Sequence, residues 1–179
     1  MNRIIIFIFL LKFFYSYSQQ YLPVSNSEVI NHTYYTLSYS EFHEQAEWVH
    51  YKLSPEMING SFKRTNNFRQ DKKVSTGSAS LADYRKSGYE RGHLAPAGDM
   101  KLSYNMMSES FLLSNISPQN PSFNKGGWKT LEKLVRSWAS KSSLYITTGG
   151  ILSDLTLNKI GKNNVSIPNR FYKIIFNPN

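Results

Sequence analysis

Short runs of β-branched and aromatic residues, separated by polar stretches, recur along the chain. They lie at residues 32–40, 48–53, 144–150, 165–168 and 171–176. Their length and composition predict β-strands. A separate set of apolar residues has the helical spacing 3, 4, 3, namely Trp128, Leu131, Val135 and Trp138. This spacing predicts a helix with one buried face, and Asn124 stands where that helix would start, a good capping position.

Residues 1–18 have the composition of a signal peptide. A positive start at Arg3 is followed by an apolar run and by small residues that end at Ser18. The run is too short for a membrane span, which needs about 20 residues. Lys12 within the run leaves an uncleaved anchor as the alternative. We therefore predict a single mature domain at residues 19–179, secreted or periplasmic, with no stable membrane span.

Composition favours a folded domain with a polyanionic partner. The chain has 179 residues, of which 40% are hydrophobic and 15% aromatic, unlike a disordered chain. Its formal net charge of +9 favours nucleic acid as the partner, although a positive balance can also serve solubility alone. Because the chain has no cysteine, disulfides and thiolate chemistry are excluded.

The stretch from residue 87 to residue 136 concentrates groups suited to phosphodiester hydrolysis. His93 has an ordinary pKa that suits a general base near neutral pH. Arg91 offers a planar fork for phosphate. Glu90 is placed to orient an imidazole or an asparagine by hydrogen bonding. A histidine that follows glycine is often structural, so on this feature alone His93 could have a structural role instead.

The same stretch can hold one hard metal ion. Mg²⁺ keeps several waters and needs only one or two oxygen ligands from the protein. Asn124 can supply an amide oxygen, and Glu132, two helical turns further on, can reach metal-bound water. Arg136 follows Glu132 by four residues and is available to that carboxylate or to a phosphate. A helix cap at Asn124 and a surface pair between Glu132 and Arg136 are the structural alternatives.

Other polar residues allow two interpretations each. Arg64 and Arg69 lie in the basic stretch 61–86, which is either a solvated loop or an edge of the cleft that faces phosphate. Asn115 and Gln119 either contact substrate or tie a loop to backbone groups.

The remaining histidines, His32, His43 and His50, are predicted to be structural. His43 and Glu47 have i, i+4 spacing but lack the surrounding pattern of a metalloprotease helix. A zinc hydrolase is therefore a distant alternative.

Three blocks of sequence, in this order, resemble the DNA/RNA non-specific endonucleases of the ββα-metal, or His-Me finger, superfamily. They are Tyr-Glu-Arg-Gly-His-Leu-Ala-Pro-Ala at 89–97, Ser-Asn-Ile-Ser-Pro-Gln at 114–119 and Phe-Asn-Lys-Gly-Gly-Trp at 123–128. The resemblance implies an α+β fold with a central antiparallel sheet flanked by helices and a ββα-metal (His-Me) finger active site. It also implies that DNA and RNA are the substrates and are cut with little sequence preference.

The resemblance assigns roles to individual residues. It makes His93 the general base and Asn124 the direct ligand of Mg²⁺, with Mn²⁺ as the alternative ion. It implies that Glu132 binds the ion through water and that Arg91 and Arg136 bind phosphate. Residues expected to contact substrate around this set are Arg64, Arg69, Glu90, Asn115 and Gln119.

Two features depart from the family pattern. Glu90 replaces the commoner Asp, which keeps the acid on a longer arm. Family members usually continue beyond residue 179, so the domain at 19–179 is expected to be either complete or truncated at its C-terminus. A secreted basic module that binds nucleic acid without cutting it is the alternative function. The sequence does not fix the oligomeric state, and a homodimer is among the states considered.

Overall fold

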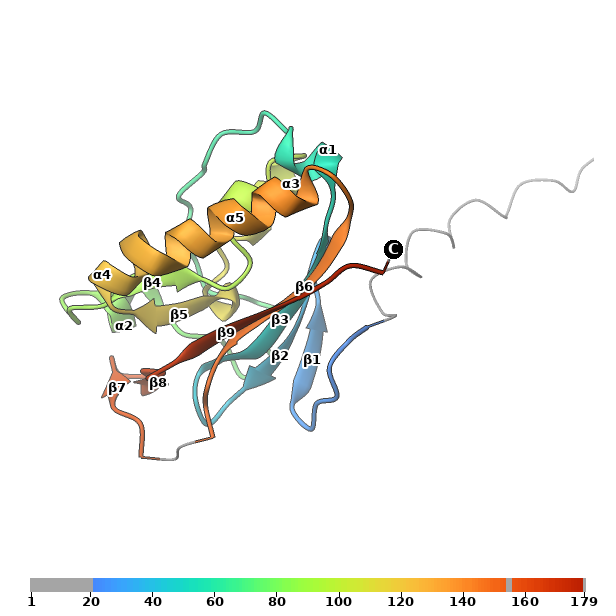
Figure 1. Cartoon of the computed structure of the whole chain (residues 1–179). Helices are drawn as coiled ribbons and strands as arrows, with labels where there is room; N and C mark the ends of the chain where they lie inside the picture. The colour runs from blue at the N-terminus through green and yellow to red at the C-terminus, as the bar shows by residue number, and fades with distance from the viewer. Residues whose placement is uncertain (1–20, 154–155, 179) are drawn as a thin grey trace, which may run out of the picture.

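The computed structural model describes residues 21–153 and 156–178, so the predicted signal peptide at 1–18 lies outside the described residues. A five-stranded antiparallel sheet with the strand order β1-β2-β3-β6-β9 forms the centre of the molecule (Figure 1). Its strands are β1 (Glu28–Asn31), β2 (Thr36–Ser40), β3 (Gln45–Leu53), β6 (Leu144–Gly150) and β9 (Phe171–Phe176). The predicted central antiparallel sheet is therefore confirmed.

The strand predictions are accurate at the centre of the sheet and less so elsewhere. β1 was not predicted, because Ile30 is its one buried residue and leaves no hydrophobic pattern. Residues 32–35 form a turn rather than the start of a strand, closed by a backbone hydrogen bond of 2.8 Å between its end residues. The run at 165–168 shortens to β8 (Val165–Ser166), which pairs with β7 (Lys159–Ile160) in a separate hairpin.

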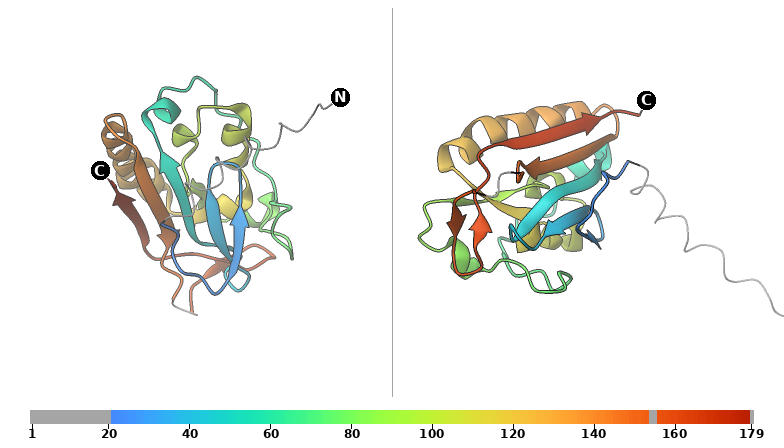
Figure 2. Two further views of the ribbon diagram at one scale, coloured as in Figure 1. Left: turned by 90° about the vertical axis from the view of Figure 1, so that its right-hand side faces the viewer. Right: turned by 90° about the horizontal axis from the view of Figure 1, so that it is seen from below.

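Helices cover one side of the sheet and complete the α+β fold. α5 (Lys129–Ala139) runs along the β6–β9 end of the sheet, as the views of Figure 2 show, and buries Val135 and Ala139. α1 (Pro55–Ile58) and α3 (Tyr104–Glu109) contribute to the same core. Within the described residues, no helix has the length and apolar character needed to cross a membrane.

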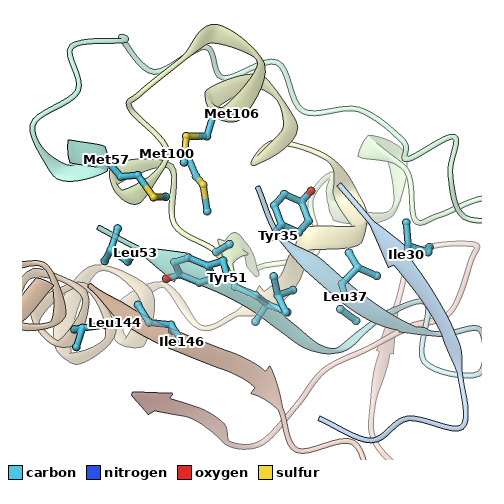
Figure 3. Close-up of a cluster of buried hydrophobic side chains, with 14 of the residues drawn as sticks. Ile30, Tyr35, Leu37, Tyr51, Leu53, Met57, Met100, Met106, Leu144 and Ile146 are labelled. Carbon is cyan, nitrogen blue, oxygen red and sulfur yellow. The ribbon is translucent and has the colours of Figure 1, made fainter. Parts of the chain in front are cut away.

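The core lies between the sheet and these helices. Tyr51 and Leu53 project from β3 toward Met57, Met100 and Met106 (Figure 3). All five side chains are buried. Methionine is flexible and fills irregular gaps, which suits a core closed by short helices and loops rather than by a second sheet.

A two-stranded ribbon leads directly into the helical segment. Its elements in chain order are β4 (Glu90–His93), β5 (Ile116–Gln119), α4 (Pro121–Phe123), η3 (Asn124–Trp128) and α5. The chain also forms α2 (Leu81–Tyr84) before the ribbon, and η1 (Ala97–Asp99), α3 and η2 (Leu113–Asn115) between its strands. Paired strands followed by a helix are the ββα arrangement that the resemblance implied.

The predicted helix is present, with two corrections. Asn120, not Asn124, caps its start, because the Asn120 Oδ1 accepts a hydrogen bond of 2.9 Å from the Ser122 backbone N–H. The side chain of Asn124 is therefore not used as a cap. Trp138, expected on the buried face, is 43% exposed.

Candidate active site

A pocket of about 630 Å³ opens between the β4 strand, the loop before α2, and the helical segment. Its lining residues are Arg64, Asn66, Phe68, Leu81, Tyr84, Arg85, Tyr89, Glu90, Arg91 and Asn124. Of the residues predicted from sequence, the pocket brings together Arg64, Glu90, Arg91 and Asn124. Loop and helix residues that are far apart in the chain therefore line the same pocket.

Asn124 and Glu90 form the polar centre of this pocket. The Asn124 Nδ2 donates a hydrogen bond of 2.8 Å to the Glu90 Oε2, and Lys125 pairs with the other carboxylate oxygen. Hydrogen bonds from Lys125 and Asn124 hold the pKa of Glu90 below its ordinary value. Glu90 thus fixes the Asn124 amide, as the sequence allowed, and the longer arm of glutamate still reaches it.

The orientation of Asn124 fits a single hard cation. With the amide nitrogen turned to Glu90, no hydrogen bond from the described residues engages the Asn124 oxygen. A neutral amide oxygen is a ligand that Mg²⁺ accepts while it keeps its waters. Among the described residues there is no cluster of three or more His, Cys, Asp or Glu side chains able to hold a metal. The donor set here therefore suits an ion that takes few protein ligands, not a closed cage of the zinc type.

His93 differs from the other histidines of the chain. It is 8% exposed, and its Nε2 is buried without a hydrogen-bond partner among the described residues. The rings of Phe68 and Phe111 flank it, with centroids 5.5 and 5.0 Å away. Burial, together with the charges of Arg64 and Arg91, lowers the pKa of His93 to about 3. The ordinary pKa expected from the sequence is therefore not kept. The imidazole is neutral at pH 7, the form that can accept a proton, but with this pKa it is a weak base in the substrate-free protein.

Each of the other three histidines has a polar neighbour. His32 lies 2.8 Å from Asp71, His43 lies 2.9 Å from the Ser166 hydroxyl and His50 lies 2.8 Å from the Thr147 hydroxyl. The prediction that these three are structural agrees with these contacts. Among the described residues, His32 Nδ1 and His50 Nε2 are also buried without a partner, so an unpaired nitrogen does not by itself single out His93. His93 is distinguished by its place on β4 beside Arg91 and by a pKa lowered to about 3.

Two of the three arginines that line the pocket, Arg64 and Arg91, lie against aromatic rings. The Arg91 guanidinium lies 4.2 Å from the centre of the Phe68 ring, and the Arg64 guanidinium lies 4.7 Å from that of Phe111. Such cation–π contacts orient a guanidinium while leaving its N–H groups free for an anion. No sequence pattern singled out Phe68 or Phe111, because isolated aromatic residues are usually part of the core.

Arg136 is paired differently from the prediction. Its Nη1 donates a hydrogen bond of 2.7 Å to the buried Asp99, whose other oxygen accepts one of 2.8 Å from the Tyr51 hydroxyl. Asp99, not Glu132, is thus the ion-pair partner of Arg136. Glu132 is half-buried, and burial raises its pKa to about 7.

Lys173, which the sequence did not suggest, completes this part of the site. Its ammonium donates a hydrogen bond of 2.6 Å to the Thr148 hydroxyl and lies 4.9 Å from the centre of the Trp128 ring. Burial lowers the pKa of Lys173 to about 8, although the nearby acids Asp99 and Glu132 oppose that shift.

Two of the predicted substrate contacts are placed elsewhere. The Arg69 Nη1 donates hydrogen bonds to the backbone oxygens of Ser108, at 2.9 Å, and Asn67, at 3.2 Å. Asn115 is fully buried and bonds backbone groups of Ala95 and Ser110 at 2.8 to 3.0 Å. Neither lines the pocket, because both hold loops to the finger.

Gln119 is a third such case. It is fully buried, and neither its Nε2 nor its Oε1 has a partner among the described residues. Its side chain packs onto Gly92, where an added Cβ would lie 2.1 Å from the Gln119 Cδ. Any larger residue at position 92 would therefore force the Gln119 side chain to move from this position over the ribbon. Gln119 does not line the pocket either.

Comparison with solved structures finds the same architecture in a nuclease. The crystal structure of the EndoG/EndoGI complex, which describes a mechanism of EndoG inhibition, contains a similar chain. The TM-score is 0.77 at 33% sequence identity, over 84% of this chain and 68% of that one. The predicted ββα-metal fold is confirmed by this similarity.

Curated relatives are similar in sequence as well. The mitochondrial nuclease EXOG of Danio rerio is 37% identical over 86% of this chain and 48% of its own length. The mitochondrial endonuclease G of Homo sapiens is 37% identical over 79% of this chain and 52% of its own length. The chain thus spans about half the length of these curated relatives.

The predicted secreted or periplasmic location is wrong on this comparison. The relatives from Danio rerio, Homo sapiens, Bos taurus and Mus musculus are named as mitochondrial nucleases, and this finding contradicts the prediction. The prediction rested on the composition of residues 1–18 alone. A short basic and apolar segment does not identify the compartment to which a protein is targeted.

The family assignment follows from a match that extends over most of the chain. A family model described as DNA/RNA non-specific endonuclease matches residues 16–179. That span contains the ribbon, the helix and every residue of the pocket. The chain therefore belongs to the DNA/RNA non-specific endonuclease family.

Proposed function

We propose that this chain is a metal-dependent endonuclease that hydrolyses phosphodiester bonds of DNA and RNA without sequence specificity. The observation that carries the proposal is the Glu90-oriented Asn124 amide, which lines one pocket with Arg64 and Arg91. Next to Arg91 lies the unpaired imidazole of His93. The family membership and the net charge of +9 support nucleic acid as the substrate.

The proposed reaction uses His93 as the general base. The scissile phosphate binds between the guanidiniums of Arg64 and Arg91, which neutralise its charge and fix its orientation. The neutral imidazole of His93 takes a proton from the attacking water, and the aromatic walls keep other water away from it. In the free protein the charges of Arg64 and Arg91 disfavour a protonated His93. The negative charge of a bound phosphate offsets these charges and so favours protonation of the imidazole during the reaction.

The metal would be held by few residues. Asn124 would bind the ion directly and Glu132 through water, with Mg²⁺ as the proposed ion and Mn²⁺ as the alternative. When bound, the ion supplies positive charge for the phosphoryl and leaving oxygens. Arg136 lies one helical turn after Glu132 on α5 and is anchored by Asp99 of η1, and it is proposed to add positive charge on this side of the phosphate. A homodimer stays a prediction.

Cleavage of supercoiled plasmid and of RNA by the full chain tests the proposal. Nicking is expected with Mg²⁺, not with EDTA, and is expected to fall at least tenfold in Asn124→Ala. Circular dichroism should show that this variant is folded, because the Asn124 side chain does not cap the helix. A folded wild-type protein that binds plasmid in a salt-sensitive manner but never nicks it would favour the alternative, a basic module that binds nucleic acid without cutting it.

A further inference from the structure

The pocket extends past the proposed catalytic residues to α2 and the turn that follows it. There it is lined by Leu81, Tyr84, Arg85 and Tyr89, to which the reaction above gives no role. A volume of about 630 Å³ is in the range of pockets that hold whole small molecules, and is more than a single phosphate needs.

The side chains at this end are an unusual combination. Arg85 is exposed, and none of the ion pairs among the described residues includes it. Leu81 is 43% exposed. Tyr89 is half-buried and rests against the cluster that contains Ile116. An aromatic ring and an exposed cation that line one pocket can together hold a nucleotide, by stacking on the base and by charge on the phosphate.

Charge across the whole pocket favours more than one phosphate. Its lining residues include the guanidiniums of Arg64, Arg85 and Arg91, and a single carboxylate, that of Glu90. Glu90 is already engaged by Asn124 and Lys125, so it does not neutralise the arginines. A strand with successive phosphates supplies the missing negative charge.

This end of the pocket is fixed to the finger. The buried Tyr84 donates its hydroxyl hydrogen bond to the Ile116 backbone oxygen at 3.2 Å, which ties α2 to β5. In the turn, the Ser87 hydroxyl donates to the Tyr84 oxygen at 3.0 Å and accepts from the Tyr89 N–H at 3.2 Å. Gly88 has a φ of +83°, a conformation that glycine adopts without strain. A rigid turn loses little entropy when it binds a ligand.

We propose that Arg85 and Tyr89 form a nucleotide subsite beside the scissile phosphate, and that this subsite makes the enzyme favour single-stranded nucleic acid. Tyr89 stacks on an unpaired base, and Arg85 binds the phosphate next to it. In a duplex the faces of each base are covered by its neighbours, so the ring of Tyr89 has nothing to stack on. This inference rests on the proposed function, since it extends the same pocket.

The test compares kcat/KM for a single-stranded DNA oligonucleotide of about 12 residues with that for its duplex, in Mg²⁺. Tyr89→Leu keeps an apolar side chain against the core but removes the ring, and is expected to lower the ratio of single-strand to duplex kcat/KM about tenfold, through KM. Tyr89→Phe should keep the ratio. Arg85→Gln should lower it severalfold, whereas Arg170→Gln, an exposed arginine outside the pocket, should not.

Two outcomes overturn the subsite. One is an unchanged ratio in Tyr89→Leu, whether kcat/KM is retained or falls equally on both substrates, and the other is a Tyr89→Phe variant that loses the ratio as Tyr89→Leu does. Binding of the same oligonucleotides in EDTA, followed by fluorescence anisotropy, separates this inference from the proposed function. If the wild type cuts neither substrate, the proposed function fails. The subsite then still predicts that Tyr89→Leu weakens single-strand binding about tenfold, and unchanged binding refutes it.

Discussion

His93→Leu is expected to remove the proposed base and at the same time to make the fold less sensitive to acid. In the folded chain the imidazole is buried between Phe68 and Phe111, and its Nε2 has no partner among the described residues. Leucine is apolar and of similar size, so it can occupy the same space without an unpaired nitrogen. An unsatisfied buried polar group costs about 1–3 kcal/mol, so the variant should be at least as stable as the wild type at neutral pH.

The pH dependence of the free energy of unfolding can be worked out from the pKa of His93. The pKa of His93 is lowered from 6.5 to about 3 in the fold, first by burial and then by the charges of Arg64 and Arg91. Between those two values the unfolded chain binds a proton that the folded chain does not, so the free energy of unfolding falls as the pH falls. At 1.36 kcal/mol per pH unit, the wild type loses about 2 kcal/mol between pH 7.5 and pH 5 from this residue alone. His93→Leu does not suffer this loss.

Urea denaturation at pH 7.5 and pH 5, in EDTA, measures the effect. The difference in unfolding free energy between His93→Leu and wild type should grow by about 2 kcal/mol in favour of the variant. Phe111→Leu changes the opposite wall of the same space without removing a titrating group, and its difference from wild type should be nearly the same at both pH values. If the His93→Leu difference does not change with pH, His93 titrates normally in the fold, and the account of its burial is wrong.

Three further changes have distinct expected results. Glu90→Ala frees the amide of Asn124, so the Mg²⁺ concentration for half-maximal cleavage should rise about tenfold or more, measured by plasmid titration, since partners of metal ligands typically contribute that much. Unaltered metal dependence would remove Glu90 from the site. Asn115→Ala should lower the unfolding free energy by about 2–3 kcal/mol in urea, because its backbone partners stay buried, while KM for plasmid stays the same; a raised KM with unchanged stability would restore its predicted substrate contact. Asp99→Ala leaves Arg136 without its partner, and a loss of about 3 kcal/mol is expected in the same assay, whereas a loss below about 1 kcal/mol would make the pair a surface contact.

The structure brings together the candidate site residues that lie close together in sequence. Glu90, Arg91 and His93 are on one short strand, and Asn124 follows the strand paired with it, so the fold brings them together through local pairing. The sequence alone left open whether Glu90 oriented an imidazole or an asparagine. The hydrogen bond to Asn124 answers that question, and it depends on the side chain reaching across the ribbon.

Residues supplied by distant segments were not predicted. Lys173 comes from the edge strand β9, and Asp99 from the short η1 segment, and each reaches the site only after the sheet and α5 have packed. For Asn115, the sequence left two interpretations open for the opposite reason. It lies within the motif, but a buried asparagine that bonds two backbone oxygens has the same sequence signature as one that contacts substrate.

Trp138 shows a limit of periodicity. At 100° per residue, it lies about 80° around the helix from Trp128 and about 100° from Ala139, at the border of the apolar stripe. Val135 and Ala139 are buried and define the centre of the face that meets the sheet. The 3, 4, 3 spacing therefore predicted the helix and its buried side, but not which of its outer positions would be covered.

The rate of supercoiled-plasmid nicking by the full chain in Mg²⁺, beside His93→Ala, tests the central claim most directly. The account predicts that the wild type nicks the plasmid and that the variant, still folded by circular dichroism, is slower by about 10² to 10⁴, the usual contribution of a general base. A folded His93→Ala protein that nicks at the wild-type rate would contradict the assignment of the base and, with it, the proposed mechanism.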